Sequence, residues 1–358
     1  MIRRIPIFAY DWTLVAAVLA VNALGLITLK SAAPSPDLML TQLVGLAVGI
    51  GGAVVLQLAS RRQVMAASYS LFAISLFLLL AVLVFGREVN GAKAWFVLGP
   101  FRFQPSELAK IALVLSLARV AASRPLVSIL DYLKPLALAA PALALVLVEP
   151  DLGGAMVMAA TVFAILFVRG MPTRHLLAGL ALLAVLVPVV LWPNLKPYQQ
   201  ERVQLVLNPE QDPLGGGFQM IQSKIAIGSG GLFGKGYGQG TQTQLGFVPF
   251  RHTDFIFAVL AEEWGFVGAL GLLLLYAILF LRLVRMAQEC GRLEDQLVLV
   301  GIFSMLSFQV LVNIGVTLGL APVTGLTLPL FSYGGSSLIM VYLAIGLAML
   351  VHRDRHQM

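Results

Sequence analysis

One carboxylate stands at a boundary between polar and apolar sequence. Asp254 follows a polar, glycine-rich stretch, Pro193–Thr253, and a long apolar run begins directly after it. A charge near the centre of a bilayer costs roughly 2.5–3.5 kcal/mol or more, so an acid at this boundary is a candidate functional residue. An ionised acid held within about 3 Å of a hydroxyl oxygen can act as a general base. We therefore expect Asp254 to take part in the chemistry of this protein.

Glu107 and Lys110 form a second candidate pair, about one turn apart on a predicted helix. Pro105 suits the first turn of that helix, and Glu107 there complements the helix dipole without any ligand. Lys110 lies inside an apolar stretch near the positive end of the dipole, where it is unfavourable unless an anion is close. We predict that Lys110 contacts substrate, and we add Glu107 and the preceding Trp95 as candidate substrate contacts.

Two polar features lie within or between apolar runs. Asp151 occupies a very short connection, where it either caps the following helix or projects into a cavity. Gln309, Asn313 and Thr317 are spaced four residues apart and share one face of a predicted helix. Such a stripe more often holds helices together than binds substrate.

The segment 324–337 is rich in glycine, proline and hydroxyl residues, and it precedes the last apolar run. This composition predicts non-helical or re-entrant backbone, which is tolerated at membrane depth only where it lines protein or water. Gly334–Ser337, at a helix start, offers backbone N–H groups to an anion such as phosphate. The alternative is a serine cap with no ligand. Ser336 is the candidate substrate contact here.

The composition places all of these residues in a membrane protein. Hydrophobic residues make up 59% of the chain and charged residues 11%, with a mean hydropathy of +0.91; a soluble domain has roughly 25% charged residues. Apolar runs of about 17–25 residues can cross a bilayer as helices, whereas β-barrel strands are shorter and alternate in polarity. We predict an all-α integral membrane protein, a single polytopic domain over residues 1–358. Its roughly ten spans are Trp12–Leu29, Gln42–Leu58, Ala66–Phe85, Ser106–Ala122, Tyr132–Val148, Leu152–Val168, Leu176–Leu191, Phe255–Leu281, Gln296–Leu318 and Ser337–Val351.

The 24 Lys and Arg residues set the expected orientation. Most of them fall on the side of the N-terminus, and half of the others lie in Pro193–Thr253, a long loop that the positive-inside rule discounts. We expect both termini to be cytoplasmic, and the loop between the seventh and eighth helices to be extracellular, with Asp254 and the other polar clusters on its side. The net charge of +7 reflects this bias and contact with anionic membrane lipid, with no nucleic acid as partner. Cys290 is the only cysteine in the sequence, so no disulfide framework or cysteine metal site is expected.

The long loop supplies further cations and one expected helix. Arg202, Lys224 and Arg251 place positive charge near the predicted membrane surface. Apolar and polar residues alternate unevenly over Phe218–Ile227, which is typical of a short interfacial helix lying on the bilayer. The alternative is a solvated connector, although an unstructured loop of this length between packed spans is unusual unless it is functional.

Several motifs resemble those of the SEDS family (shape, elongation, division, sporulation). They are NGAKAW, QPSELAK, EPDLGGA, RHTDFIFAVLAEEWGFVG and LPLFSYGGSSL, and they run from about Arg87 to Leu338. The resemblance implies a peptidoglycan glycosyltransferase that polymerises lipid II into glycan strands at the outer face of the bacterial cytoplasmic membrane. It also implies Asp254 as the essential carboxylate and a class B penicillin-binding protein as partner. Short terminal tails favour the elongation member over the division homologue.

Two positions depart from the family pattern. Phe250 stands where the family often has a second acid near Asp254, and Ala94 stands where a basic residue usually precedes the tryptophan. The first departure removes a second carboxylate from the Asp254 loop. The second weakens the case for a basic substrate contact beside Trp95.

The expected mechanism is a single inverting displacement with Asp254 as the general base. The leaving pyrophosphate needs positive charge, for which Lys110 and Arg251 lead, followed by Arg202 and Lys224. Glu107 and Asp151 either orient these cations or help to hold a divalent cation, magnesium or manganese, although the sequence has no dedicated metal motif.

Two rival functions remain open at this stage. One is a transporter that flips lipid II across the membrane, which intramembrane polar residues and a broken helix would also suit. The other is a scaffold that positions a partner synthase, with structural acids. Ionisable residues that crowd one face, instead of lining a path across the membrane, favour surface chemistry.

Overall fold

The computed structural model describes residues 10–33, 35–89, 92–99, 101–186, 188–189, 192–194, 197–207 and 216–356. The first half of the chain contains α1 (Trp12–Ala32), α2 (Pro36–Leu56), α3 (Arg61–Phe85), β1 (Arg87–Val89), β2 (Ala92–Leu98), β3 (Phe101–Phe103), α4 (Pro105–Ser123), the 3-10 turn η2 (Ile129–Tyr132), α5 (Leu133–Val148) and α6 (Leu152–Val168). The second half contains α7 (Thr173–Leu186), α8 (Trp192–Asn194), α9 (Pro197–Leu207), α10 (Gly216–Ser229), α11 (Thr241–Gln244), α12 (Ile256–Glu289), α13 (Leu293–Thr317), α14 (Gly335–Arg353) and η5 (Asp354–His356).

Nine of the ten predicted spans fall on helices, and the seventh, Leu176–Leu191, begins on α7 and extends to residues outside the described part of the chain. The protein is an all-α membrane protein apart from one small sheet. Within the described residues, seven helical stretches are long and apolar enough to cross a membrane: α1, α2, α3, Ile129–Val148, α12, α13 and α14. α6 and α7 are shorter apolar helices, and α4 carries Glu107, Lys110 and Arg119. The number of membrane crossings therefore stays a prediction.

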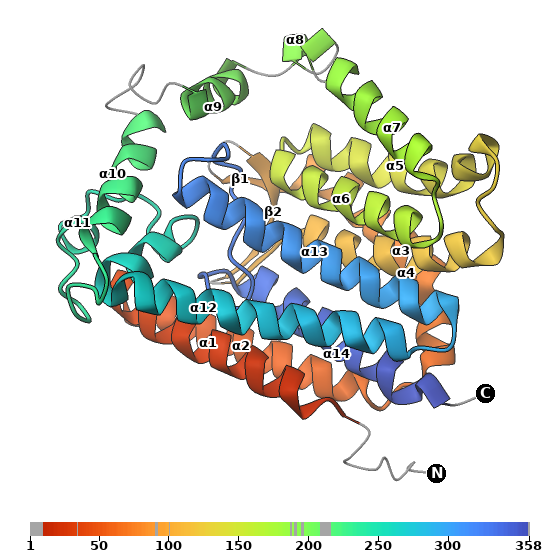
Figure 1. The fold of residues 1–358 in the computed structure, drawn as a ribbon, viewed down its shortest axis with the longest axis horizontal. Helices are drawn as coiled ribbons and strands as arrows, with labels where there is room; N and C mark the ends of the chain where they lie inside the picture. The colour runs from red at the N-terminus through yellow and green to blue at the C-terminus, as the bar shows by residue number, and fades with distance from the viewer. Residues whose placement is uncertain are drawn as a thin grey trace.

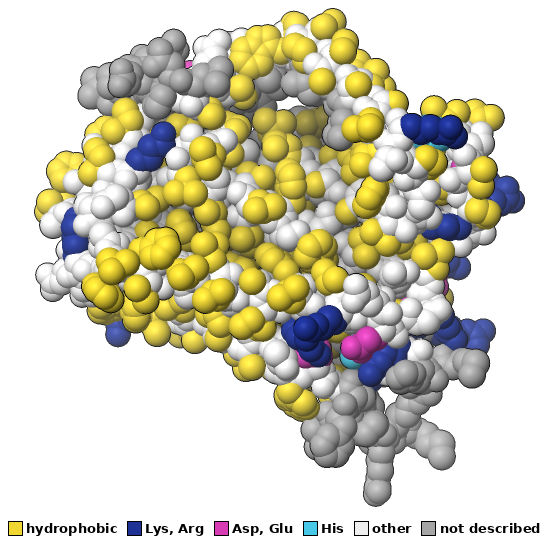
Figure 2. Space-filling view, in the orientation of Figure 1, with side chains coloured by type: hydrophobic (Ala, Val, Ile, Leu, Met, Phe, Trp, Pro, Cys, Tyr) yellow, Lys and Arg dark blue, Asp and Glu magenta, His cyan; other side chains and the backbone are white. Residues whose placement is uncertain are grey.

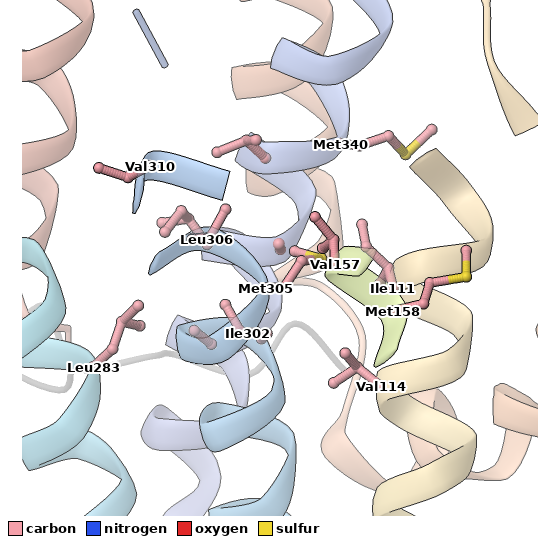
Figure 3. Close-up of a cluster of buried hydrophobic side chains, with 14 of the residues drawn as sticks. Ile111, Val114, Val157, Met158, Leu283, Ile302, Met305, Leu306, Val310 and Met340 are labelled. Atoms are coloured by element: carbon pink, nitrogen blue, oxygen red, sulfur yellow. The ribbon is translucent and has the colours of Figure 1, made fainter. Parts of the chain in front are cut away.

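Helix α13 lies at the centre of the bundle and packs against α4, α6, α12 and α14 (Figure 1). Apolar side chains from all five helices meet around it (Figure 3). They include Ile111 and Val114 of α4, Val157 and Met158 of α6, Leu283 of α12, Ile302, Met305, Leu306 and Val310 of α13, and Met340 of α14. This core fixes the ends of α4, α6, α12 and α14 relative to one another.

Small residues let α2 and α14 approach closely. A Cβ added at Gly346 of α14 would lie 2.9 Å from the Cα of Ala53, and one added at Gly45 of α2 would lie 3.1 Å from the Cα of Gly335. Contact between small residues is a common basis of helix pairing in membranes, where van der Waals packing replaces the hydrophobic driving force. α2 thereby positions the first turn of α14.

A small antiparallel sheet between α3 and α4 was not predicted. Its strands run in the order β1-β2-β3, with Trp95 opposite Arg87 and Val97 opposite Arg102. The available signal was the Asn-Gly dipeptide at 90–91, a strong hairpin turn, although the placement of these two residues lies outside the described part of the chain. The sheet ends at Gln104, the N-cap residue of α4.

The predicted long loop contains the helices α8 to α11. The expected helix at Phe218–Ile227 is confirmed as α10, which packs against α12. Glu262 of α12 accepts hydrogen bonds from the backbone N–H groups of Gln242 and Thr243 at 2.8 and 3.0 Å, and pairs with Lys235 at 2.7 Å. Its neighbour Glu263 accepts from Gln244 at 3.2 Å. These two glutamates hold the 230–246 segment across α12.

Ion pairs join helix ends that are far apart in the sequence. Asp11, the N-cap of α1, pairs with Arg282 near the end of α12. Arg61, at the start of α3, pairs with Glu294 and Asp295 of α13, and its backbone N–H donates to Asp354 after α14. The start of α1 and the end of α14 therefore lie at the same end of the bundle, as Figure 1 shows.

Candidate active site

Asp254 lies in a tight turn, residues 251–255, immediately before α12. The backbone of Phe250 adopts a positive φ of 50°, and its carbonyl accepts hydrogen bonds from the N–H groups of Thr253 and Phe255 at 3.0 and 3.3 Å. The turn reverses the chain as it leaves the 230–246 segment. It places Asp254 at the positive end of the α12 dipole, where a carboxylate is stabilised.

Three successive carbonyl groups of this turn are held by the C-terminal part of the chain. The His252 oxygen accepts from the Tyr333 N–H at 2.9 Å, and the Thr253 oxygen accepts from the Ser332 hydroxyl at 2.7 Å. The Asp254 oxygen accepts from the side-chain amide of Asn313 at 3.0 Å. The backbone position of Asp254 is thus fixed from outside its own loop.

The non-helical segment between α13 and α14 is confirmed, and its part from Leu328 to Ser332 is buried in protein. Asn22 donates to the carbonyl of Leu330 at 2.9 Å, and Tyr276 donates to that of Pro329 at 2.6 Å. Gln42 donates to the Ser332 carbonyl and accepts from the Gly334 N–H, both at 3.1 Å. Side chains of α1, α2 and α12 therefore satisfy backbone groups that no helix pairs, as membrane depth requires.

The start of α14 excludes one of the two alternatives considered for it, the serine cap. Its N-cap residue is Gly334, which makes no side-chain capping hydrogen bond. The Gly334 N–H is occupied by Gln42, and the Ser336 hydroxyl accepts from the Gln104 N–H at 3.2 Å. Gln42 caps this helix from outside because glycine has no side chain of its own to do so.

The second predicted cluster assembles where α4, α6 and α14 begin. Lys110 pairs with Glu107 at 2.8 Å and is only 3% exposed. Asp151 caps α6 by accepting from the Gly154 N–H at 2.7 Å, which selects the capping interpretation. Its other oxygen accepts from Gln104 and from the Ser106 hydroxyl at 3.1 and 3.2 Å. Gln104 thus bridges Asp151 to Ser336.

Asn313 and Leu326 connect this cluster to the Asp254 turn. The Asn313 amide that donates to Asp254 also donates to the carbonyl of Leu326 at 2.7 Å. Gly153, in the first turn of α6, lies against Leu326 so tightly that an added Cβ would be 2.7 Å from its Cγ. Asn313 therefore has a structural role, as predicted for the stripe, but it joins α13 to two non-helical segments and not to another helix. Through Leu326 and Gly153, the helix start that Asp151 caps is connected to the Asp254 turn.

Burial sets the protonation of the groups around the site. Burial, together with the nearby Asp151, raises the pKa of the Glu149 carboxyl to about 8. Burial also raises the pKa of Asp151, opposed by the Gly154 N–H and by Lys110. The pKa of His252 is lowered by burial and by Arg251, so its imidazole is neutral at pH 7.

The structure connects the remaining candidate substrate contacts less firmly to the site. Arg251 donates from Nε to the Ala32 carbonyl at 2.6 Å. Lys224 is an exposed residue of α10 whose stem passes over Gly319, and Trp95 is half-buried in β2. Arg202 falls on α9, with a side chain outside the described part of the structure.

The carboxylates suggested for a divalent cation are already engaged. Glu107 accepts from Lys110, and both oxygens of Asp151 accept from N–H or O–H donors. No group of three or more His, Cys, Asp or Glu side chains among the described residues could hold a metal. This arrangement does not fit a magnesium or manganese ion, and we derive no step through one.

Five residues that hold the site together were given no role from the sequence, although Gln104 and Ser332 lie in polar segments that it singled out: Asn22, Gln42, Gln104, Tyr276 and Ser332. A signal existed for Asn22 and Gln42, because a polar residue inside an apolar helix needs a buried partner. The identity of that partner depends on tertiary packing, which spacing alone does not reveal.

The chain matches the cell cycle protein family FTSW_RODA_SPOVE over residues 3–357 and belongs to this family, which confirms the resemblance to SEDS proteins. It is 44% identical over 294 residues to peptidoglycan glycosyltransferase MrdB of Escherichia coli (strain K12), covering 80% of this chain and 77% of that protein. It is 42% identical over 289 residues to stage V sporulation protein E of Bacillus subtilis (strain 168), covering 79% and 78%.

Solved structures agree with this assignment. The rod shape determining protein RodA of Thermus thermophilus is 48% identical, with a TM-score of 0.77, over 98% of this chain and 99% of that one. A chain in a study of polymerization and crosslinking by a peptidoglycan synthase complex is 55% identical, with a TM-score of 0.87 and the same coverage. The chain is therefore a peptidoglycan glycosyltransferase of the multi-pass membrane type.

Proposed function

We propose that this protein polymerises lipid II during cell elongation, with Asp254 as the general base. The acceptor 4-hydroxyl would give its proton to Asp254 while its oxygen attacks C1 of the donor sugar. The C1–oxygen bond to the α-pyrophosphate breaks, the lipid pyrophosphate leaves with the electron pair, and C1 inverts. The observation that carries this role is the series of hydrogen bonds on three successive carbonyls, because a base must be fixed within hydrogen-bonding distance of its hydroxyl.

Arg251 is a better candidate than Lys110 to stabilise the leaving pyrophosphate. It is three residues from Asp254 and uses only Nε on the Ala32 carbonyl among the hydrogen bonds of the described residues. Lys110 is nearly fully buried and paired with Glu107. We assign Lys110, Glu107, Asp151 and Ser336 to shaping the substrate pocket at the three helix starts, and Trp95, Arg202 and Lys224 to outer substrate contacts.

The protein is proposed to sit in the bacterial cytoplasmic membrane as one polytopic domain, with both termini inside and residues 193–253 outside. The shared end of α1 and α14, and the polyprenyl tail that must lie in lipid, support this orientation. Apolar side chains cover much of the face in Figure 2, as a lipid-embedded surface requires. A class B penicillin-binding protein is the proposed partner, supported by the likeness to a chain of a peptidoglycan synthase complex.

The test is polymerisation of lipid II by the purified protein with its class B partner present. Asp254→Asn should lower the rate at least a hundredfold, because general-base catalysis contributes about 10²–10⁴-fold. Asp37→Asn is the matched control, since Asp37 is an exposed carboxylate at the start of α2. It should leave the rate unchanged.

Two outcomes would reject the catalytic proposal. One is polymerisation by Asp254→Asn at the rate of the unaltered protein. The other is transfer of fluorescent lipid II between the leaflets of a vesicle without any glycan product, which would select the transporter. Gel analysis of glycan length and a leaflet-quenching assay on the same preparation separate these results.

A further inference from the structure

A pocket lies at the opposite end of α4 from Lys110. Its volume is about 230 Å³, and its lining comes from the last turn of α4, the η2 turn and the start of α5. Lys110 and Ser123 are thirteen residues apart on α4, or about 20 Å at about 1.5 Å per residue, so this pocket is well separated from the Glu107–Lys110 pair. It cannot belong to the site around Asp151.

Two cations line the pocket without an anionic partner. Arg124 and Lys134 are exposed, and neither forms a hydrogen bond or ion pair with the described residues. The one carboxylate in the lining, Asp131, accepts from the backbone N–H groups of Val127 and Ser128 at 3.0 and 2.7 Å. Asp131 thus closes its own turn, and the pocket keeps a net positive lining.

The rim of the pocket is apolar and exposed. Four large side chains beside Arg124 and Lys134 are between 59% and 74% exposed: Val127, Ile129, Leu130 and Leu133. They lie between the end of α4 and the first residue of α5. On the predicted topology this is the cytoplasmic surface of the membrane, where acyl chains meet headgroups. In Figure 1 this connection (yellow) is at the right-hand end, near the C-terminus, and Lys and Arg side chains gather along the same edge in Figure 2.

We propose that this pocket binds the phosphodiester of an anionic phospholipid, with the acyl chains lying along the exposed rim. Unpaired cations in a concave site select a negative headgroup, and each juxtamembrane Lys or Arg residue strengthens the binding of anionic lipid about fivefold. The apolar rim selects a lipid over a free phosphate. This site is independent of the catalytic proposal, since it shares no residue with it.

The experiment titrates short-chain phosphatidylglycerol into the full-length protein in detergent and follows the melting temperature. Binding to the folded state raises that temperature. Arg124→Gln with Lys134→Gln should weaken half-saturation roughly thirtyfold, at about 1 kcal/mol for each charge. Arg62→Gln with Arg285→Gln is the matched control, because both of these residues are exposed and lie outside the pocket. It should leave half-saturation unchanged.

Titrations with two other ligands test whether the site selects an anionic lipid. Phosphatidylcholine of the same chain length should give no shift, and glycerol phosphate should give none at the concentrations where phosphatidylglycerol saturates. An equal shift with glycerol phosphate would replace the lipid by a free phosphate and overturn the proposal. So would equal half-saturation in the pocket variant and the control. If the double variant does not fold, Lys134→Gln alone should show about fivefold weakening, with bound lipid counted by native mass spectrometry.

Discussion

At the scale of single residues, Glu149 is the most unusual group near the site. It is fully buried, and neither carboxyl oxygen has a hydrogen-bond partner among the described residues. Burial and the neighbouring Asp151 raise its pKa to about 8, so this carboxyl is protonated at neutral pH. A neutral acid avoids the large cost of an unpaired buried charge.

Glu149→Gln should therefore make stability less dependent on pH. The folded pKa of about 8 lies above the ordinary 4.5, so the folded state holds this proton longer than the unfolded chain. The free energy of unfolding then falls as pH rises from about 4.5 to about 8. Above that range, the contribution of the proton held by Glu149 is fully lost. Melting temperatures in detergent across this range should fall less in Glu149→Gln than in the unaltered protein.

The control is Glu88→Gln, which neutralises an exposed carboxylate on β1. Its melting curves should show the same pH dependence as the unaltered protein. A Glu149→Gln protein with that same dependence would show that Glu149 is ionised when folded.

At the scale of elements, one side chain of α13 holds two segments that surround the site. Asn313→Ala removes the hydrogen bonds to Asp254 and Leu326, and each unsatisfied carbonyl costs roughly 1–3 kcal/mol. The turn that carries Asp254 loses its anchor to α13. We expect kcat for lipid II polymerisation to fall about tenfold or more with little change in KM, because positioning matters most in the transition state.

Gln309→Ala is the comparison for this prediction. Gln309 lies one turn earlier on the same face, is buried, and has a side-chain oxygen without a partner among the described residues. The Gln309→Ala protein should keep most of the kcat of the unaltered protein. Equal kcat values in the two variants would mean that the stripe acts only in packing.

The helices could be predicted because a helix that crosses a membrane needs a long run of apolar residues. Long apolar runs gave nine of the ten predicted helices and the start of the seventh, α7, and the uneven pattern around Phe218 gave α10. The β1–β3 sheet was missed because β1 and β3 have only three residues each, too few to show an alternating pattern. Asp254, Lys110 and Glu107 were identifiable as charges in apolar surroundings, whereas the bridging role of Gln104 depends on three helix starts meeting in space.

At the scale of the whole molecule, the orientation in the membrane can be tested with two exposed positions. Asp37, at the start of α2, and Arg62, at the start of α3, lie at opposite ends of α2, about 31 Å apart along its axis. In a Cys290→Ser background, Asp37→Cys should react with a membrane-impermeant maleimide in intact spheroplasts. Arg62→Cys should react only after permeabilisation. The reverse pattern would place Asp254 inside, since Arg251 contacts Ala32 close to Asp37.

The ion pairs of Arg61 also bear on how the protein is made. Its ion-pair partners Glu294 and Asp295, and Asp354, which accepts from its backbone N–H, all belong to the last part of the chain to be synthesised. When α3 enters the membrane, none of these partners has been synthesised. Arg61 stays unpaired with them while the ribosome adds more than two hundred residues. We therefore expect the start of α3 to be fixed only once α13 has been synthesised, so a ribosome that stops early leaves Arg61 without its ion-pair partners.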